Sequence, residues 1–275
     1  MKSREERFLE LRRSLERLGE MSVVKTRPTL CAPYGDDLTE FGFAHVNWAP
    51  MIWQGDEPLA DTHPLIKNAK VFSIGLSSVL ACLQLDLKPG DKLLDMCAAP
   101  GIKSLYLQLL HDKKLALYVN DLSHDRLLRL RRLFDQFDIP QPVYSNQPGQ
   151  SLLNKYDPAY FDAIIIDAPC SGEGTILEGD EAALDAWSPA KVKRLAQMQR
   201  KLIMAAQKLI KPSGQLVYST CTLNEHENER AIKKAGGAVV STSYSGPENV
   251  KLVPGQAARL LPSEEGIGFF VAKLV

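Results

Sequence analysis

The chain has 275 residues, enough for one large α/β domain or for a domain with a modest extra lobe, because single cores stop growing near about 250–300 residues. Its 33 basic residues balance its 33 acidic residues, so a nucleic-acid site has to be a local patch rather than a property of the whole surface. We expect a cytoplasmic protein without a membrane segment, because no apolar run reaches about 18 residues and the start "MKSREERFLE" is too charged for a secretory signal.

The N-terminal 70 residues predict a small lobe that could contact the phosphates of a nucleic acid. Residues 4–18 have the apolar stripe of an amphipathic helix, with capping-box spacing between Ser3 and Glu6 and a stop at Gly19. Its polar face is rich in arginine, for which solvation is the ordinary interpretation and phosphate binding the alternative. Residues 22–70 hold five prolines, two tryptophans and no long periodic run, which is typical of short strands and loops.

Residues 71–275 predict an α/β fold with a doubly wound, mostly parallel sheet. Strand-like runs end at Asp95 and continue in "LALYV", "FDAIIID" and "GQLVYST". They alternate with helical patterns at about 73–87, 103–110, 123–137 and 189–210. Continuous apolar runs separated by helices indicate parallel strands that are buried on both faces and joined by right-handed crossovers. The last run, "GFFVAKLV", is expected to return antiparallel at the sheet edge.

The first two strands end in residues suited to a nucleoside ligand. An open parallel sheet binds ligands beyond the carboxyl ends of its strands, and the small residues of "CAAPGIK" let a backbone turn approach such a ligand closely. This turn matches neither the P-loop nor the dinucleotide glycine pattern. Asp121 stands where a carboxylate commonly binds ribose hydroxyls; helix capping is the alternative, for which Ser123 is better placed. S-adenosylmethionine, a nucleoside without pyrophosphate, fits both features.

The five cysteines are odd in number and contain no C-x-x-C pair, so the sequence predicts neither a disulfide framework nor a metal site. Cys170 lies in the turn "DAPC", stiffened by its proline, and Cys221 ends the next strand, so both thiols could face one cleft. Taken singly, each could be an inert small hydrophobe. We expect Cys31 and Cys82 to be core residues and Cys97 to be structural.

The stretches "DMCAAPGIKS", "DAPCSGEG", "WSP" and "YSTCTLNEHENE" resemble the signature blocks of the Sun-type (Fmu/Nop) RNA cytosine-5 methyltransferases, closest to the bacterial ribosomal-RNA branch. The resemblance spans about residues 70–275 and implies a Rossmann-like, S-adenosylmethionine-dependent enzyme acting on RNA. It implies Cys221 as nucleophile, Cys170 as the thiol that releases the product, and Asp167 and Lys103 as contacts to the base. The cofactor contacts that it implies are Cys97, Ala98, Ala99, Pro100, Gly101, Ile102, Lys103, Asp121 and Asp167.

This chemistry explains why two thiols would be needed. Carbon 5 of cytosine is a poor nucleophile, so a thiolate adds to carbon 6 and makes an enamine that can accept a methyl group. Asp167, with a raised pKa, would donate a hydrogen bond or a proton to the ring nitrogen. Cys170 as a thiolate could then accept the carbon 5 proton, directly or through water. Lys103 or the cofactor's sulfonium would favour the thiolate form.

Two departures from the family pattern leave alternatives open. Ile102 replaces the second glycine of the turn, and no acid follows the strand near Val143 to contact the adenine, where Asn146 could substitute. A catalytically weak RNA-binding or assembly factor is therefore one alternative. A DNA cytosine-5 methyltransferase is another, because "PC" and "ENV" both occur, but "ENV" follows the Cys221 strand instead of preceding it.

The expected partner is RNA, with ribosomal RNA favoured over transfer RNA, and we expect a monomer without a metal. Two clusters of basic residues are candidate phosphate contacts, with a solvated helix face as the ordinary interpretation of each. These clusters are Arg126, Arg129, Arg131 and Arg132, and Lys191, Lys193 and Arg194.

Overall fold

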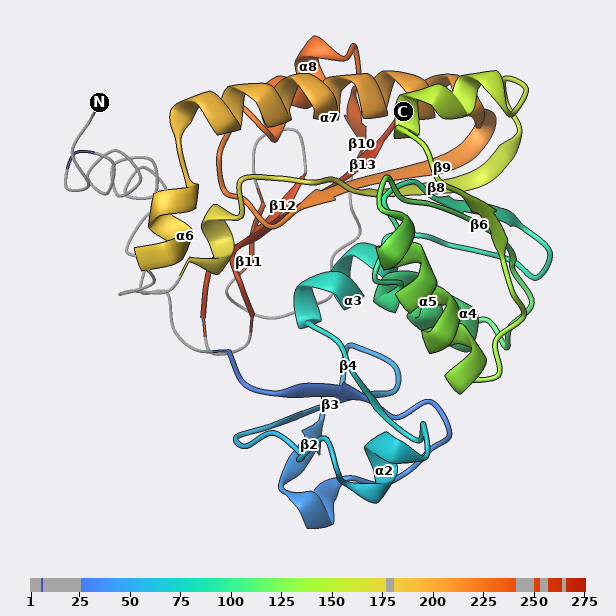
Figure 1. Ribbon diagram of the computed structural model, residues 1–275, viewed down its shortest axis with the longest axis vertical. Coiled ribbons are helices and arrows are strands. Elements are labelled where there is room, and N and C mark those ends of the chain that lie inside the picture. The colour runs from blue at the N-terminus through green and yellow to red at the C-terminus, as the bar shows by residue number, and fades with distance from the viewer. Residues whose placement is uncertain (1–5, 7–25, 177–180, 241–249, 253–256, 264–265) are drawn as a thin grey trace.

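The computed structural model describes residue 6 and residues 26–176, 181–240, 250–252, 257–263 and 266–275 (Figure 1). The helix expected over residues 4–18 therefore lies outside the described residues, apart from Glu6. So does most of the "ENV" triplet, of which only Val250 is described, as the first residue of a strand.

The N-terminal residues form a small antiparallel sheet with the strand order β2-β3-β1-β4. Its strands are β1 (Thr29–Cys31), β2 (Phe43–His45), β3 (Ile52–Gly55) and β4 (Phe72–Ser73), with the helical turns η1 (Thr39–Phe41) and α2 (Pro64–Lys67) between them. Short strands and loops are what the sequence predicted here. The division of the chain at residue 70 stays a prediction, since β4 ties the residues just beyond it to this sheet.

The larger sheet has the strand order β11-β12-β13-β9-β8-β5-β6-β7, with β10 paired to β13. Strands β5 to β9 run parallel, and β10 to β13 pair antiparallel. The predicted doubly wound α/β fold is thus confirmed. The strands are β5 (Lys92–Asp95), β6 (Ala116–Asn120), β7 (Val143–Ser145), β8 (Phe161–Asp167), β9 (Ile210–Thr220), β10 (Val239–Val240), β11 (Val250–Leu252), β12 (Ala258–Leu260) and β13 (Phe269–Leu274).

Strand β13 returns antiparallel to β9, as expected, but its expected place at the sheet edge is wrong. Its other side pairs with β12, in the register Ala258↔Val271, and β11 follows beyond. Residues 269–272 of β13 are buried, so their backbone groups need hydrogen-bonding partners on both sides. The short strands β12 and β11 supply the outer side.

Helices cover both faces of this sheet (Figure 1). One face carries α3 (Leu76–Cys82), α4 (Ile102–Leu110) and α5 (His124–Gln136), and the other carries α7 (Pro189–Leu209) with η2 (Gly149–Asn154). Shorter helical segments are η3 (Glu173–Thr175), α6 (Glu181–Ala186) and α8 (Glu229–Lys234). Among the described helices, none is long and apolar enough to cross a membrane.

Helix α3 is shorter than the predicted span of 73–87, whereas α4, α5 and α7 match their predictions to within a residue or two. Ser73 belongs to β4 and pairs with Leu30, so the helix can start only after Gly75. Helix α5 begins at the expected cap, because the Ser123 hydroxyl accepts the backbone N–H of Arg126.

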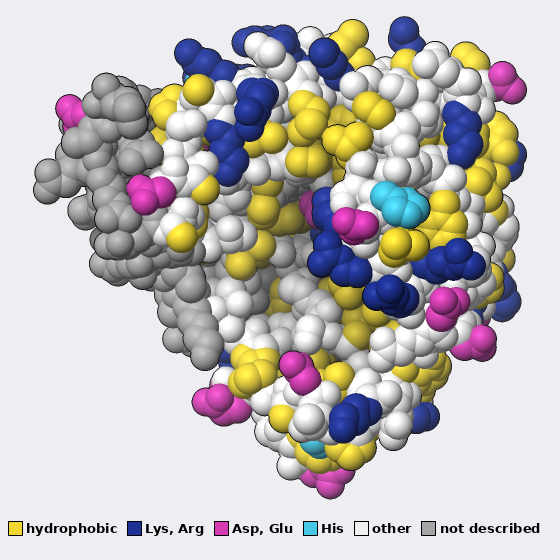
Figure 2. All heavy atoms as spheres, in the orientation of Figure 1, with side chains coloured by type: hydrophobic (Ala, Val, Ile, Leu, Met, Phe, Trp, Pro, Cys, Tyr) yellow, Lys and Arg dark blue, Asp and Glu magenta, His cyan; other side chains and the backbone are white. Residues whose placement is uncertain are grey.

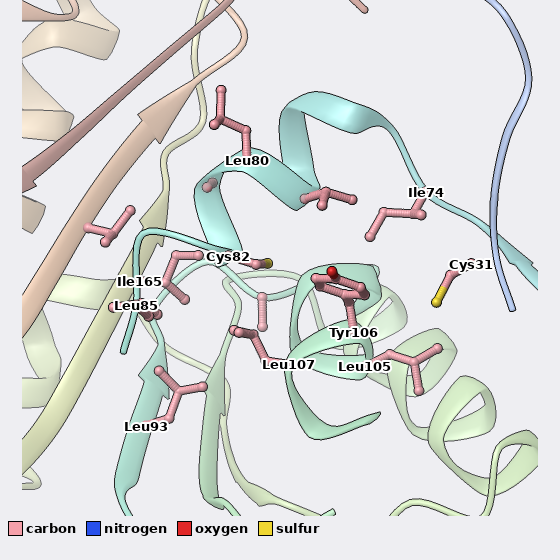
Figure 3. Packing of buried hydrophobic residues seen from close by; sticks show 14 of the residues in the cluster. Cys31, Ile74, Leu80, Cys82, Leu85, Leu93, Leu105, Tyr106, Leu107 and Ile165 are labelled. Atoms are coloured by element: carbon pink, nitrogen blue, oxygen red, sulfur yellow. The ribbon is translucent and has the colours of Figure 1, made fainter. Parts of the chain in front are cut away.

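The apolar core continues from the larger sheet into the N-terminal sheet. Figure 3 shows Cys82 of α3 beside Tyr106 and Leu107 of α4, with Cys31 of β1 on the far side of the tyrosine ring. Cys31 and Cys82 are completely buried, which confirms their core role, and the Tyr106 hydroxyl donates to the carbonyl of Pro50 at 3.1 Å. The N-terminal sheet is therefore packed against helix α4, which follows the first strand of the site.

Candidate active site

The carboxyl ends of β5, β6, β8 and β9 lie side by side, and the strand order reverses between β5 and β8, where open α/β sheets bind ligands. A cavity of about 630 Å³ opens there, between this edge and the N-terminal sheet. Figure 2 shows the surface hollowed between the domain of the larger sheet and the N-terminal lobe. Its lining includes Asp95, residues 97–100, Ile102, Lys103 and Asp167 from the larger sheet, residues 73–78 at α3, and residues 26–30, Pro58 and Leu59 from the N-terminal part.

The turn of residues 97–103 is held in place by the end of the neighbouring strand β6. Asp121 is 4% exposed; its carboxylate accepts the backbone N–H of Ala99 at 3.2 Å and that of Ser123 at 2.9 Å. Gly101 has φ of +107°, and a Cβ there would lie 2.6 Å from Leu130, so this position requires glycine. The carboxylate of Asp121 thus fixes the turn, while the helix cap is Ser123.

Two polar side chains join this arrangement in ways that the sequence did not indicate. The Arg126 guanidinium donates to the Ala99 carbonyl and lies 3.4 Å from the Asp121 carboxylate. Arg126, suggested above as a phosphate contact, is therefore engaged at the turn. Asn146 donates its amide N–H to the Asp121 carbonyl at 2.8 Å, which places it beside the end of β6.

Lys103 and Asp167 form an ion pair between α4 and the end of β8. Lys103 Nζ lies 2.7 Å from Asp167 Oδ2 and 2.9 Å from the Ser78 hydroxyl, and the Ser219 hydroxyl donates to Asp167 Oδ1 at 3.0 Å. Burial lowers the pKa of Lys103, but the charge and hydrogen bond of Asp167, with smaller effects of Cys82 and Asp95, together outweigh it and the net effect is a raised pKa. The pair therefore holds a lysine that stays charged at the wall of the cavity.

Behind this pair, Asp95 is 1% exposed at the end of β5. Burial raises the pKa of its carboxyl from the ordinary 3.8 to about 7, although the hydroxyl of Ser104 donates to Oδ2 at 2.7 Å and opposes the shift. Its Oδ1 makes no hydrogen bond of normal geometry to the described residues, although the nearby backbone N–H of Cys97 also opposes the raised pKa. Asp95 is thus a buried acid at the cavity wall with room for one more donor.

The structure brings Cys170 and Cys221 together, with the two sulfurs 3.0 Å apart. Their strands are parallel neighbours in which Asp167 pairs with Ser219, so the two cysteines follow at nearly the same level. The hydrogen bond to Cys221 is the largest cause that raises the pKa of Cys170, followed by burial. The same hydrogen bond lowers the pKa of Cys221, against the effect of burial. These opposite shifts favour Cys170 as the donor and Cys221 as the thiol that ionises first.

Cys97 lines the cavity but behaves differently from this pair. Burial, followed by the carboxylate of Asp95, raises the pKa of its thiol well above the ordinary value. A thiol that stays protonated is a poor nucleophile, which favours the structural interpretation of Cys97.

The family described as 16S rRNA methyltransferase RsmB/F matches residues 82–275. Ribosomal RNA small subunit methyltransferase F of Vibrio cholerae is 37% identical over 198 residues, which cover 67% of this chain and 40% of that protein. The protein of the same name from Salmonella heidelberg is 34% identical over 224 residues, 80% of this chain and 46% of that protein. The chain spans less than half the length of these relatives.

Solved structures have the same fold. NSun6 from Pyrococcus horikoshii, solved with SFG, has a TM-score of 0.70 and 26% identity, covering 79% of this chain and 56% of that one. A methyltransferase homolog protein from Pyrococcus horikoshii has a TM-score of 0.76 over 96% of this chain and 98% of that one. Its identity is 24%, so this second likeness concerns the fold alone.

Proposed function

The chain belongs to the RsmB/F family of 16S rRNA methyltransferases, and on this premise we propose that it transfers a methyl group from S-adenosylmethionine to carbon 5 of a cytosine in ribosomal RNA. The observation that carries the proposal is the pair of thiols 3.0 Å apart at the ends of β8 and β9. This reaction needs one thiol to attack and a second group to take a proton. A cytosine of transfer RNA is the alternative substrate.

In the proposed reaction, the Cys221 thiolate adds to carbon 6 and carbon 5 becomes the nucleophile that takes the methyl group. The ring then loses its carbon 5 proton, the bond between carbon 6 and sulfur breaks, and the electron pair returns to Cys221. Cys170 is suited to accept that proton. Once the Cys221 sulfur is bonded to the base, its hydrogen bond and negative charge no longer raise the pKa of Cys170, so this thiol ionises more readily, although burial still opposes its ionisation.

The residues at the switch point fit the cofactor. S-adenosylmethionine supplies the methyl group as a sulfonium, and the small side chains of the 97–103 turn leave the cavity open beside it. The amino group of the cofactor is the kind of donor that Asp95 Oδ1 lacks. Asp121 would bind the ribose, and Asp167 with Lys103 would hold the base. These assignments predict contacts that a bound complex can test.

The experiment that tests the proposal distinguishes the roles of the two thiols by replacing each of them in turn. Cys221→Ala should lose methyl transfer and form no covalent complex with RNA. Cys170→Ala should attack and methylate, then stall with the RNA attached, which a denaturing gel detects as a slower band. A complex in Cys221→Ala in place of Cys170→Ala would exchange the roles, and normal turnover in both variants would refute the mechanism.

The substrate is tested in cells. Bisulfite sequencing of ribosomal and transfer RNA, with and without the gene for this protein, should show one ribosomal cytosine that loses its methyl group. A change confined to transfer RNA would support the alternative substrate. No change in either class would support the weak RNA-binding or assembly factor instead.

A further inference from the structure

Two buried carboxylates connect the loops that carry the thiols, and the mechanism above uses neither of them. Glu173 lies three residues after Cys170, Glu227 lies six residues after Cys221, and both are completely buried. Neither belongs to the lining of the cavity. Each side chain reaches across to the loop of the other cysteine.

Glu173 binds the loop of Cys221. Its Oε2 accepts the hydroxyl proton of Thr222 at 3.1 Å, and its Oε1 accepts the side-chain N–H of Asn224 at 3.0 Å and of Trp187 at 2.8 Å. The Thr222 hydroxyl also accepts from the Ser171 hydroxyl and from the backbone N–H of Asn224. With both lone pairs occupied, that hydroxyl has to donate to position 173, which therefore requires an acceptor on this side.

Glu227 binds the loop of Cys170. Its Oε2 accepts the backbone N–H of Ser171 at 3.0 Å and the side-chain N–H of Gln199 at 2.9 Å. Gln199, which lies on α7, also donates to the carbonyl of Pro169 at 2.9 Å. The residues immediately before and after Cys170 are thus both tied to the Glu227–Gln199 pair.

These carboxylates are costly groups to bury. Burial is the largest cause of the raised pKa of Glu173 and of Glu227, in each case against hydrogen bonds that favour the charged form. A well-packed apolar pair would fill the same space without that desolvation cost, so a contribution to stability is a weak explanation for two acids at this place. A requirement for fixed loop geometry explains them better.

We propose that Glu173 and Glu227 are positioning residues that lock the Cys170 and Cys221 loops together and so keep the two sulfurs within hydrogen-bond distance. The purpose of this arrangement rests on the proposed function, because the second thiol has to lie beside the carbon that the first one activates. The geometry itself can be measured without RNA or cofactor.

The measurement uses phenylarsine oxide, which replaces its As–O bond by two As–S bonds and releases water when two thiols lie side by side. The rate of bridging is followed by intact mass, and its loss in Cys170→Ala identifies the pair. The variants are Glu173→Gln and Glu227→Gln. The matched control is Glu225→Gln, because Glu225 lies in the Cys221 loop but has a 56% exposed side chain paired with Arg230.

We expect bridging to slow by about tenfold in both variants and to stay unchanged in the control. Single-turnover methyl transfer should fall by roughly 10- to 100-fold with the KM for RNA within about twofold, because a misplacement of about 1 Å at a reacting group can cost about 100-fold. If a glutamine variant fails to fold by circular dichroism, Trp187→Phe removes one hydrogen bond to Glu173 from outside both loops and should give a smaller decrease in the same direction.

Wild-type bridging rates in the folded variants would overturn the proposal, whatever their activity. Slow bridging in the two glutamine variants, together with an unmodified enzyme that does not methylate RNA, would leave the positioning role standing and refute the proposed function. The two ideas therefore fail by different observations.

Discussion

Lys103→Met removes the positive charge from the ion pair at the cavity wall while it keeps most of the apolar stem of the side chain. The Lys103 side chain is 12% exposed and lies 2.7 Å from Asp167. Removing one partner of a buried pair costs about 3–5 kcal/mol. Asp167 is 34% exposed and keeps the Ser219 hydroxyl, so we expect a smaller loss of unfolding free energy, about 2–3 kcal/mol.

The same substitution should also change the reactivity of Cys221. The hydrogen bond from Cys170 is the largest cause of the lowered pKa of Cys221; burial and Asp167 oppose it, and Lys103 supports it. Without Lys103 the pKa of Cys221 should therefore rise. The assay is the rate of iodoacetamide alkylation at Cys221 as a function of pH, read by peptide mass spectrometry. The midpoint of this pH profile should move to higher pH.

Lys211→Met is the matched control, because Lys211 lies 2.6 Å from Asp162 at the opposite end of β8 and both side chains are 30–39% exposed. Exposed pairs contribute about 0–1 kcal/mol, and this variant should not affect the thiols. Equal losses of stability in the two lysine variants, or an unmoved alkylation midpoint in Lys103→Met, would refute the reasoning.

Three further changes test other parts of the structure. The pKa of Asp95 is raised from 3.8 to about 7, so the unfolded chain loses the proton of this carboxyl at a lower pH than the folded protein does. The unfolding free energy should therefore fall as the pH rises from about 3.8 to about 7. Asp95→Asn should lack that part of the pH dependence in urea unfolding at about pH 5 and about pH 8. Gly174→Ala would place a Cβ 2.0 Å from the carbonyl oxygen of Gly268, so thermal unfolding should show a loss of about 1–3 kcal/mol of unfolding free energy. In the control Gly75→Ala the new Cβ meets only Ser77 at 3.5 Å, so the unfolding free energy should stay within about 0.5 kcal/mol of the parent. Asp121→Ala should weaken S-adenosylmethionine binding in calorimetry by about 1.5–3 kcal/mol, and an unchanged affinity would contradict the ribose contact.

The sheet could be predicted from sequence because parallel strands buried on both faces are continuous apolar runs. The run "FDAIIID" matches β8 residue for residue. The errors have another origin: α3 starts late because Ser73 pairs with Leu30, and β13 lies inside the sheet because β12 pairs with it. Both depend on short strands that have no periodicity of their own.

The site shows the same division. Residues at the ends of neighbouring parallel strands can be assigned to one edge from the strand order alone, which is how Cys170 and Cys221 could be placed together. The contacts that hold them could not be predicted, because Glu173 and Thr222 are 49 residues apart and Ser171 and Glu227 are 56 apart. Hydrogen bonds over such distances leave no local pattern.

The asymmetry between the thiols follows from the charges around them. A hydrogen bond between two thiols has no preferred direction by itself, so the neighbouring groups decide which sulfur keeps the proton. Beyond that bond and burial, the charges of Cys221 and Glu227 raise the pKa of Cys170. Around Cys221, the charge of Asp167 raises the pKa and the charge of Lys103 lowers it. In the proposed mechanism, Cys221 therefore ionises before Cys170, which is the order that its role as nucleophile requires.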